Sequence, residues 1–351
     1  MMKAAVFLEP GRIEVQDIPI PEVGPDDVLV RVRAASICGT DLRIFKHGHF
    51  KLPAGTPRVL GHEVAGEIAD VGSGVADWLV GDRVSLTPNV GCGRCEMCRR
   101  GLNQMCPTYE AFGITLNGGF EEYLLVPGWA IERGNLFRLP DGASFEVGAI
   151  MEPASCCLHG QRKVRVSSED SVLVIGAGPI GCFHTLLAKR HGARQVIVAN
   201  RRQPRLDIAG RLGADELVNV GEQDLRDEVM RLTDGRGVDV VITSVSDRDV
   251  IASATDLLAR LGRINVFSGL GDAARPPIDV NALHYRELVL TGTTGSSNDD
   301  YRDVLGMLGT GDVDLSPIIS RRFVVDDIHA AMEHSASGAG MKPVIVFEGT
   351  D

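Results

Sequence analysis

The sequence predicts a two-domain α/β protein in which a β-rich domain is joined to a doubly wound parallel sheet. Its length of 351 residues suits two domains. Over roughly the first 150 residues, short apolar alternations such as DDVLVRVRAAS are broken by Gly and Pro, a pattern typical of strands with tight turns. From about Ser167 onward, apolar runs such as SVLVIG and VDVVIT alternate with helix-length amphipathic stretches, which indicates a parallel sheet with crossover helices.

These changes of pattern set the expected domain boundaries. We expect the β-rich domain to span residues 1–155 and the parallel-sheet domain to span residues 156–295. The remaining segment, residues 296–351, contains a helix-like DDYRDVLGMLGTG and a strand-like KPVIVFEG. This segment is too short to fold alone, so we expect it to complete the first domain.

Composition and charge exclude several classes of partner. Hydrophobic residues make up 44% of the chain and charged residues 24%, as in ordinary globular proteins. The formal charge of −11 argues against nucleic acid or an anionic membrane surface as a partner. No apolar run approaches the roughly 18 residues of a membrane span, and MMKAAVFLEPG lacks a signal-peptide core. We therefore expect a cytoplasmic protein that acts on small molecules.

Four of the eight cysteines lie within one Gly- and Arg-rich stretch, GCGRCEMCRRGLNQMC. Cys92, Cys95, Cys98 and Cys106 have the spacing C-x2-C-x2-C-x7-C, which allows four thiolates to converge on one zinc ion without distant parts of the chain. Four thiolates leave no open position, so this zinc site is expected to be structural. An iron–sulfur cluster is the main alternative, but bacterial ferredoxins place their last cysteine after three residues rather than seven; redox-active thiols are another.

A second candidate metal site combines different ligand types. Cys38 lies in SICGTDLR, and His62 and Glu63 lie in VLGHEVAGE, both within the β-rich domain. A single Cys is usually a small buried residue, so this hypothesis depends on the three occurring together. A mixed shell of thiolate, imidazole and carboxylate typically keeps a position open for water or substrate, which predicts a catalytic zinc site.

A glycine motif in the second domain indicates a dinucleotide. Gly176, Gly178 and Gly181 form GAGPIG together with Pro179 and Ile180, directly between the strand-like SVLVI and a helix-like segment. In that context the glycines permit a tight turn, close approach of the pyrophosphate and helix-to-strand packing. The free N–H groups of the following helix would meet the phosphates.

The end of the next predicted strand indicates which dinucleotide is preferred. QVIVA ends at Asn200, which lies 24 residues after Gly176 (200 minus 176), where NAD enzymes usually carry an acidic residue. Here Asn200 is followed by Arg201 and Arg202, which would attract a 2′-phosphate through charge-assisted hydrogen bonds. We therefore expect NADP to be preferred, with NAD as the alternative; the arginines could instead be solvated loop residues.

Taken together, CGTD, GHE, the four-cysteine segment and the downstream GAGPIG resemble the zinc-dependent medium-chain dehydrogenase/reductase family over the whole chain. This resemblance implies a GroES-like catalytic domain and a Rossmann domain. The stretch MEPASCC resembles the sorbitol and threonine dehydrogenase branch, which implies that Glu152 is a further carboxylate at the catalytic zinc; whether Glu63 or Glu152 ligates directly is left open. NRR also resembles NADP-using glucose dehydrogenases of the family.

The family resemblance also implies roles for residues near Cys38. Thr40 matches the hydroxyl that passes the substrate proton outward, although a Thr at a strand end can also cap backbone. Asp41 matches a carboxylate that orients the metal ligands. Arg43 and Ile44 depart from the family, where a relay His and a substrate-side Tyr are common. A basic stretch follows, RIFKHGHFK, with candidate phosphate- or carboxylate-binding groups that are more often solvated: Arg43, Lys46, His47, His49 and Lys51.

These features predict an oxidoreductase that transfers hydride between a secondary alcohol of a polyol or sugar-like substrate and NADP. Zinc would acidify the alcohol or, in the reverse direction, polarise the carbonyl. An aldose 1-dehydrogenase or a sugar-phosphate (polyol-phosphate) dehydrogenase is an alternative of the same class. A zinc-free quinone or enal reductase and a non-catalytic dinucleotide-binding protein are alternatives of other classes. The resemblance also implies a homodimer or homotetramer.

Overall fold

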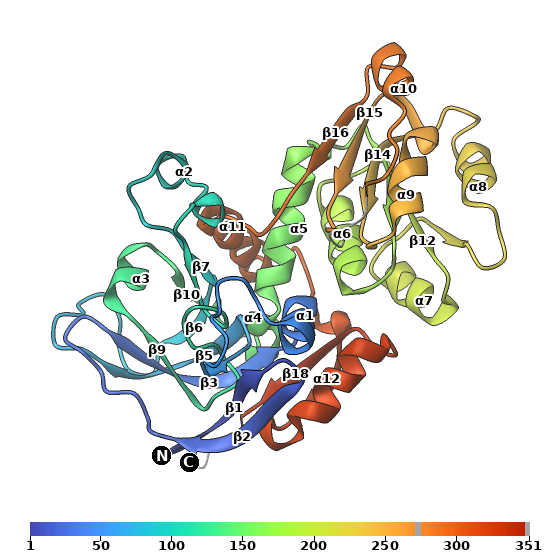
Figure 1. Ribbon diagram of the computed structural model, residues 1–351. Helices are drawn as coiled ribbons and strands as arrows, with labels where there is room; N and C mark the ends of the chain where they lie inside the picture. Colours follow the sequence, from blue (N-terminus) through green and yellow to red (C-terminus); the bar gives the residue numbers. More distant parts are fainter. Residues whose placement is uncertain (271–274, 348–351) are drawn as a thin grey trace. The chain divides into compact units, whose positions relative to one another are not determined.

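The computed structural model describes residues 1–270 and 275–347, and the chain divides into two compact units. The first unit comprises residues 1–155 and the segment from Ser296 onward, and the second comprises residues 156–295. Figure 1 follows the chain through both units. None of the helices formed by the described residues is long and apolar enough to cross a membrane.

The first unit is built mainly from short antiparallel strands. A seven-stranded sheet has the order β10-β6-β5-β3-β18-β17, with β9 also paired to β3, and smaller sheets join β2-β1-β4 and β7-β8. The strands are β1 (Met2–Glu9), β2 (Arg12–Ile18), β3 (Val28–Ser36), β4 (Arg58–Val59), β5 (Glu63–Val71), β6 (Arg83–Leu86), β7 (Asn89–Val90), β8 (Glu110–Ala111), β9 (Tyr123–Val126), β10 (Leu136–Arg138), β17 (Ile319–Phe323) and β18 (Lys342–Val346).

Helices of the first unit are short, apart from two in its C-terminal segment. They are α1 (Gly39–His47), α2 (Glu96–Arg99), α3 (Gly128–Glu132), α4 (Phe145–Ala149), α11 (Asn298–Gly309) and α12 (Ile328–Ser337), with 3-10 turns η1 (Asn103–Met105), η3 (Ser316–Ile318) and η4 (Val325–Asp327). The C-terminal strand β18 runs antiparallel to β3, with Val344 opposite Ser36. The segment after Ser296 therefore supplies β17 and β18 to a sheet whose other five strands come from the first 140 residues.

The second unit is a six-stranded parallel sheet of order β13-β12-β11-β14-β15-β16. Counted from β11 as strand 1, this is the order 3-2-1-4-5-6 of dinucleotide-binding sheets. Its strands are β11 (Ser171–Ile175), β12 (Gln195–Asn200), β13 (Glu216–Asn219), β14 (Val238–Thr243), β15 (Leu258–Val266) and β16 (Val289–Gly292), and its helices are α6 (Pro179–Arg190), α7 (Gln203–Arg211), α8 (Leu225–Leu232), α9 (Arg248–Ser253) and α10 (Val280–Tyr285), with the turn η2 (Ala254–Leu257). Helix α5 (Met151–Lys163) begins in the first unit and ends in the second.

Strand β11 shows why this sheet is covered on both faces. Val172 and Val174 pack with residues of α6 and α7, whereas Leu173 and Ile175 pack with residues of α8 and η2. Successive side chains of a strand point to opposite faces, so a strand that is apolar at every position must be buried on both. The predicted fold class, a β-rich domain with a doubly wound parallel sheet, is confirmed.

Candidate active site

The four cysteines of the predicted structural site lie together in the first unit. The sulfur atoms of Cys92, Cys95, Cys98 and Cys106 are all within 4.8 Å of one another. Cys92 donates its backbone N–H to Cys106 Sγ at 3.3 Å, and Cys98 donates to Cys95 Sγ at 3.5 Å. Four thiolates around one tetrahedral zinc stand about 3.8 Å apart for Zn–S distances of about 2.3 Å, so this set of donors fits a zinc ion.

The local backbone favours deprotonation of two of these four thiols, Cys92 and Cys106. N–H groups of Arg94 and Cys95 lower the pKa of the Cys92 thiol to about 6. Thiolate rather than thiol is the form that binds metal. Burial instead raises the pKa of the Cys98 thiol to about 12, so the four thiols are not equally acidic without a metal.

The second predicted metal site is assembled from separate elements. Cys38 caps the N-terminus of α1, directly after β3, and His62 and Glu63 stand at the start of β5. Pairing of β3 with β5 places Ser36 opposite Glu63, which brings the two segments together. One ligand atom from each of Cys38, His62 and Glu63 lies within 4.8 Å of the others.

Asp41 organises the ligands of this second site, as expected of an orienting carboxylate. Its fully buried carboxylate accepts the backbone N–H groups of Cys38 at 2.8 Å and Gly61 at 3.2 Å. Its Oδ1 also lies 3.4 Å from His62 Nδ1, which leaves the Nε2 edge of the ring for a metal. Burial lowers the pKa of His62, but the charges of Asp41 and Cys38 outweigh this and raise it well above its usual value. A site this negative favours a bound cation, so its donors fit zinc.

Lys342 is a member of this site that sequence reasoning missed. Its buried ammonium lies 2.7 Å from Glu63 Oε1 and 2.5 Å from Oε2, and it donates to the carbonyl oxygen of Ile37 at 2.8 Å. Burial lowers the pKa of Lys342, but the charges of Glu63 and Cys38 raise it by more. Lys342 lies 279 residues after Glu63, so no local spacing in the sequence links the two.

Glu152 lies on the first turn of α5 and is buried. Among the described residues, it is not part of the group of ligand atoms within 4.8 Å that contains Cys38, His62 and Glu63. Its charge and that of Glu63 nevertheless both act on Tyr301 of α11: burial raises the pKa of this phenol, and the two carboxylates raise it further. The charges of both glutamates therefore reach one residue of the first unit.

Thr40 lies in the first turn of α1 and not at the end of a strand. Its Oγ1 accepts a hydrogen bond from the exposed Arg43 guanidinium at 3.3 Å. Lys51 is committed elsewhere, because its ammonium donates to the carbonyl of Tyr109 and lies 3.3 Å from the centroid of that ring. Most of the basic stretch thus forms the helix α1, and two of its cations have partners within the first unit.

The glycine motif of the second unit has the geometry that phosphate binding needs. Gly176 has φ +105°, which favours glycine, and a Cβ on Gly181 would lie 1.7 Å from the carbonyl oxygen of Gly176. Gly178 caps the N-terminus of α6, and Pro179 and Ile180 open this helix. Backbone can therefore approach a pyrophosphate closely at a helix N-terminus.

Asn200 and the arginines lie beside this motif. Asn200 Oδ1 accepts the N–H of Ala177 at 3.3 Å, and its Nδ2 donates to the carbonyl of Arg202 at 3.1 Å, so this side chain holds the two loops together. The Arg201 side chain is 79% exposed and lies 4.0 Å from Asp247. Arg205, which sequence reasoning missed, is close by, since a Cβ on Gly178 would lie 3.4 Å from its Nη1.

Comparison with known proteins agrees with this geometry. Residues 24–141 match the alcohol dehydrogenase GroES-like domain, and residues 179–310 match the zinc-binding dehydrogenase domain. The chain belongs to the zinc-binding medium-chain dehydrogenase/reductase family, and the predicted resemblance is confirmed. It is a zinc-dependent, NAD(P)-linked enzyme that acts on CH–OH groups, with a structural four-cysteine cluster and a Cys/His/Glu catalytic site.

Individual relatives match over nearly the whole chain. A sorbitol dehydrogenase from Bacillus subtilis is 32% identical, covering 95% of this chain and 93% of the relative. An L-threonine 3-dehydrogenase from Rhizobium etli is 35% identical, covering 98% of each. The solved structure of a zinc-binding dehydrogenase from Sinorhizobium meliloti, bound to NADP, is 32% identical, with a TM-score of 0.90 and 99% of each chain covered.

Proposed function

We propose that this enzyme oxidises a secondary alcohol of a polyol or sugar-like substrate and prefers NADP to NAD. The observation that carries the cofactor preference is the end of β12, where Asn200 replaces the usual acidic residue and Arg201, Arg202 and Arg205 follow. A carboxylate there would repel a 2′-phosphate, whereas guanidinium groups would bind it. The related structure from Sinorhizobium meliloti, which contains NADP, supports the same preference.

The residues around Cys38 are suited to alcohol oxidation. Zinc, when bound, supplies a Lewis acid that lowers the pKa of the substrate hydroxyl. Cys38 and His62 would hold it, with Asp41 fixing the His62 ring through Nδ1. Thr40 would accept the proton of the substrate hydroxyl at Oγ1 while its own hydroxyl proton passes outward to solvent. Both carboxylate oxygens of Glu63 lie within ion-pair distance of the Lys342 ammonium. We therefore assign direct ligation of zinc to Glu152 and an orienting role to Glu63.

Polyols are the proposed substrate class because a sorbitol dehydrogenase is among the relatives that match nearly the whole chain. A polyol-phosphate or sugar-phosphate is the second candidate, and one observation favours it. Arg43 is exposed and lies beside the Thr40 hydroxyl, where it could bind a phosphate on the substrate. The family relationship favours an enzyme over a non-catalytic dinucleotide-binding protein.

The test is a substrate panel measured with NADP and NAD in parallel. It contains polyols, aldoses, their phosphates and L-threonine, and kcat/KM is compared for each pair. Replacing both Arg201 and Arg202 by Ala should lower the NADP-to-NAD preference about 10- to 100-fold, since a hydrogen bond to a charged group contributes about 1.5–3 kcal/mol. Arg211→Ala, an exposed charge at the far end of α7, is the matched control. An unchanged preference in the double variant would contradict the proposed role of the arginines.

We also propose that the protein is a cytoplasmic homo-oligomer, dimeric or tetrameric. All eight cysteines are free, as expected in a reducing compartment. Strand β16 lies at the edge of the parallel sheet, and large apolar side chains are exposed on and near it: Leu261, Val280, Tyr285, Val289 and Leu290. An exposed apolar edge strand usually has a partner, and a second copy could pair with it about a two-fold axis. Light scattering of wild type and Leu290→Lys tests this, with a shift to monomer expected in the variant.

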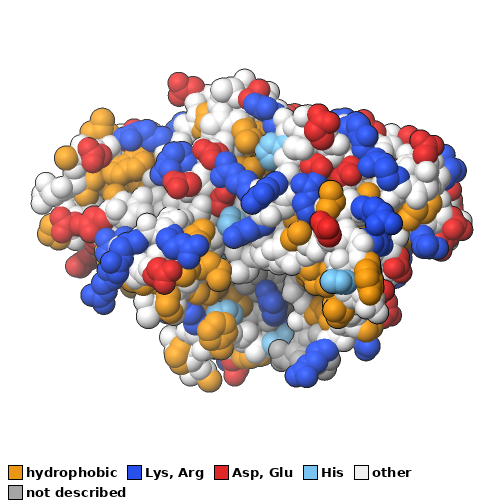
Figure 2. All heavy atoms as spheres, turned by 90° about the horizontal axis from the view of Figure 1, so that it is seen from above, with side chains coloured by type: hydrophobic (Ala, Val, Ile, Leu, Met, Phe, Trp, Pro, Cys, Tyr) orange, Lys and Arg blue, Asp and Glu red, His pale blue; other side chains and the backbone are white. Residues whose placement is uncertain are grey.

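Acidic and basic side chains are interspersed over the face of the molecule drawn in Figure 2. This mixture and the formal charge of −11 fit a small-molecule enzyme. Substrates of the panel should therefore be chosen by their functional groups rather than by overall charge.

A further inference from the structure

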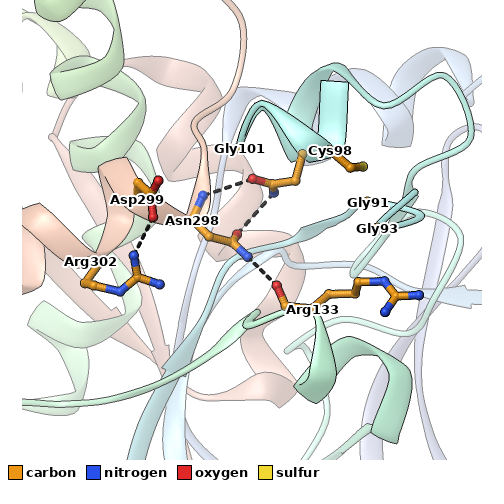
Figure 3. A pocket seen from close by; sticks show the side chains of 9 residues that line it. Gly91, Gly93, Cys98, Gly101, Arg133, Asn298, Asp299 and Arg302 are labelled. Atoms are coloured by element: carbon orange, nitrogen blue, oxygen red, sulfur yellow. Dashed lines mark hydrogen bonds and ion pairs between the residues drawn. The ribbon is translucent and has the colours of Figure 1, made fainter. Parts of the chain in front are cut away.

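Asn298, the first residue of α11, makes hydrogen bonds to three separate segments of the first unit. Its Oδ1 accepts from Thr87 Oγ1 at 2.8 Å and from Asn103 Nδ2 at 3.1 Å. Its Nδ2 donates to the carbonyls of Arg133 at 2.9 Å and Gly134 at 3.1 Å. Its backbone N–H donates to Asn103 Oδ1 at 3.0 Å, which makes the contact with Asn103 reciprocal. Figure 3 shows this side chain between the cysteine lobe and the Arg133 carbonyl.

Through Asn103, Asn298 is linked to the cysteine lobe, the loop that carries Cys92, Cys95, Cys98 and Cys106. Asn103 lies between Cys98 and Cys106 in sequence, and its Nδ2 also donates to the carbonyl of Asn89 at 2.8 Å. A Cβ on Gly91 would lie 2.6 Å from Cys98 Sγ and 3.1 Å from the Asn103 Cβ, so Asn103 packs against the same loop as the thiols. Order in the lobe therefore fixes the position of the Asn103 amide.

Through the residues that precede it in the chain, Asn298 is also linked to Glu152. Ser297 caps α11 in a reciprocal box with Asp300, which fixes the backbone just before Asn298. The preceding residue, Ser296, shares a buried hydrogen bond of 2.7 Å with Ser155, whose Oγ lies 2.7 Å from the carbonyl of Glu152. The contacts thus form one continuous path from the thiol loop to the first turn of α5.

Tyr301, three residues further along α11, lies within range of the charges of both carboxylates. Tyr301 is buried, donates to Ser85 Oγ at 2.8 Å, and is close enough to Glu152 and Glu63 for both charges to act on it. A shift of the first turn of α11 would therefore also move Tyr301 relative to the charges of the two carboxylates.

We propose that Asn298 is a positioning residue that couples the four-cysteine lobe to the catalytic metal site, by holding α11 and Ser155 where Glu152 can ligate zinc. The proposal rests on the function proposed above, in which Glu152 is a zinc ligand. Its physical basis is that a half-buried amide with every group hydrogen-bonded tolerates few alternative positions, whereas loss of one partner leaves polar groups unpaired. Metal in the lobe then stabilises one arrangement of the catalytic ligands.

The test is a double-mutant cycle on the affinity of the catalytic site for zinc, measured by chelator competition on the full-length enzyme. Asn298→Ala and Asn103→Ala should each weaken binding about 10-fold, as is typical when partners of metal ligands are removed. Cys95→Ala, which removes a ligand of the cysteine lobe, should weaken zinc binding at the catalytic site by a similar factor when introduced into the wild type. In the Asn298→Ala background it should weaken this binding little further. Asn103→Ala keeps all four thiols, so it tests the path even if Cys95→Ala does not fold.

Asp27→Ala is the matched control, because Asp27 joins two other loops of the same unit through the N–H groups of Gly24 and Gly128. It should lower the Tm without changing zinc affinity. The proposed coupling between the two metal sites is contradicted if Asn298→Ala lowers the Tm but leaves zinc affinity unchanged. It is also contradicted if the effect of Asn298→Ala on zinc affinity simply adds to that of Cys95→Ala.

A second readout separates this proposal from the proposed function. Backbone amides of residues 154–156 should exchange hydrogen faster in Asn298→Ala than in wild type, whatever Glu152 ligates. If Glu152→Gln leaves zinc affinity unchanged, the assigned role of Glu152 fails, while faster exchange in Asn298→Ala would still show that the path exists. Unchanged exchange would overturn the path itself.

Discussion

The two metal sites of the first unit are built in opposite ways. The cysteine lobe takes all four ligands from 15 consecutive residues, and three of its four cysteines are only half-buried. The site at Cys38 takes its ligands from the β3–α1 junction and the start of β5, and Lys342 of β18 joins them there. Four ligands that enclose one metal ion can come from a single short stretch of chain. A site with an open position needs buried charges that only distant strands can bring together.

This difference predicts that the site at Cys38 is needed for catalysis and that the cysteine lobe is needed for local stability. Cys38→Ala should lower kcat at least about 1000-fold, because it removes a ligand of the metal that acidifies the alcohol. The variant should retain one zinc per chain, held by the lobe. Cys95→Ala should instead lose the lobe zinc and lower the Tm, with a smaller loss of kcat. Metal analysis and steady-state kinetics check both; equal losses of activity would remove the distinction between the sites.

The buried ion pair of the catalytic site should be sensitive to loss of one partner. Lys342→Met leaves the Glu63 carboxylate buried without its cation, which should destabilise the fold by about 3–5 kcal/mol. For a unit of this size that corresponds to a drop in Tm of roughly 10 °C, measured by thermal unfolding. The double variant Lys342→Met with Glu63→Gln should recover much of the loss. An unchanged Tm in Lys342→Met would show that the buried Glu63 carboxylate does not need the Lys342 ammonium for stability.

Glu121 offers a contrast to Glu63, since it is a buried carboxylate with no cation of the described residues in salt-bridge distance. Burial raises its pKa well above the usual value, and the more distant charge of Arg58 offsets this only in part. A raised carboxyl pKa costs stability as the pH rises above the unfolded value of about 4.5 and the unfolded state ionises first. Glu121→Gln should therefore raise the Tm by about 2 °C or more at pH 7.5 and have little effect near pH 4. Thermal unfolding at both pH values tests this; an equal gain at both would exclude ionisation as the cause.

The fold class and the family could be predicted from sequence because their signals are local. The alternation of strand-like and helix-like runs indicated the parallel sheet, and the structure confirms it. The spacing of Cys92, Cys95, Cys98 and Cys106 indicated zinc for a similar reason, since ligands that are close in sequence converge with few alternatives. The cofactor assignment of zinc with NAD(P) is likewise confirmed, whereas the roles of individual site residues stay predictions.

Long-range partners were not readable from the sequence. Lys342 pairs with Glu63 across 279 residues, and a Lys near the end of a chain is ordinarily solvated. Asn298 is similar, because an Asn just after two serines indicates only the start of a helix. Arg205 lies one turn into α7, and only the folded β11–α6 loop brings it near Gly178. These residues acquire their partners from topology, which a single sequence without an alignment does not show.

The bond from Lys342 to the Ile37 carbonyl, 305 residues away, has a consequence for biosynthesis. At about 5–20 residues per second, the ribosome needs about 15–60 s to make the intervening chain, which includes the entire nucleotide-binding unit. During that time Glu63 has no cation to pair with, and the sheet lacks β18 between β3 and β17. The second unit can thus fold on the emerging chain while the first still lacks β18, and the catalytic site becomes complete only after the chain has been synthesised through Lys342.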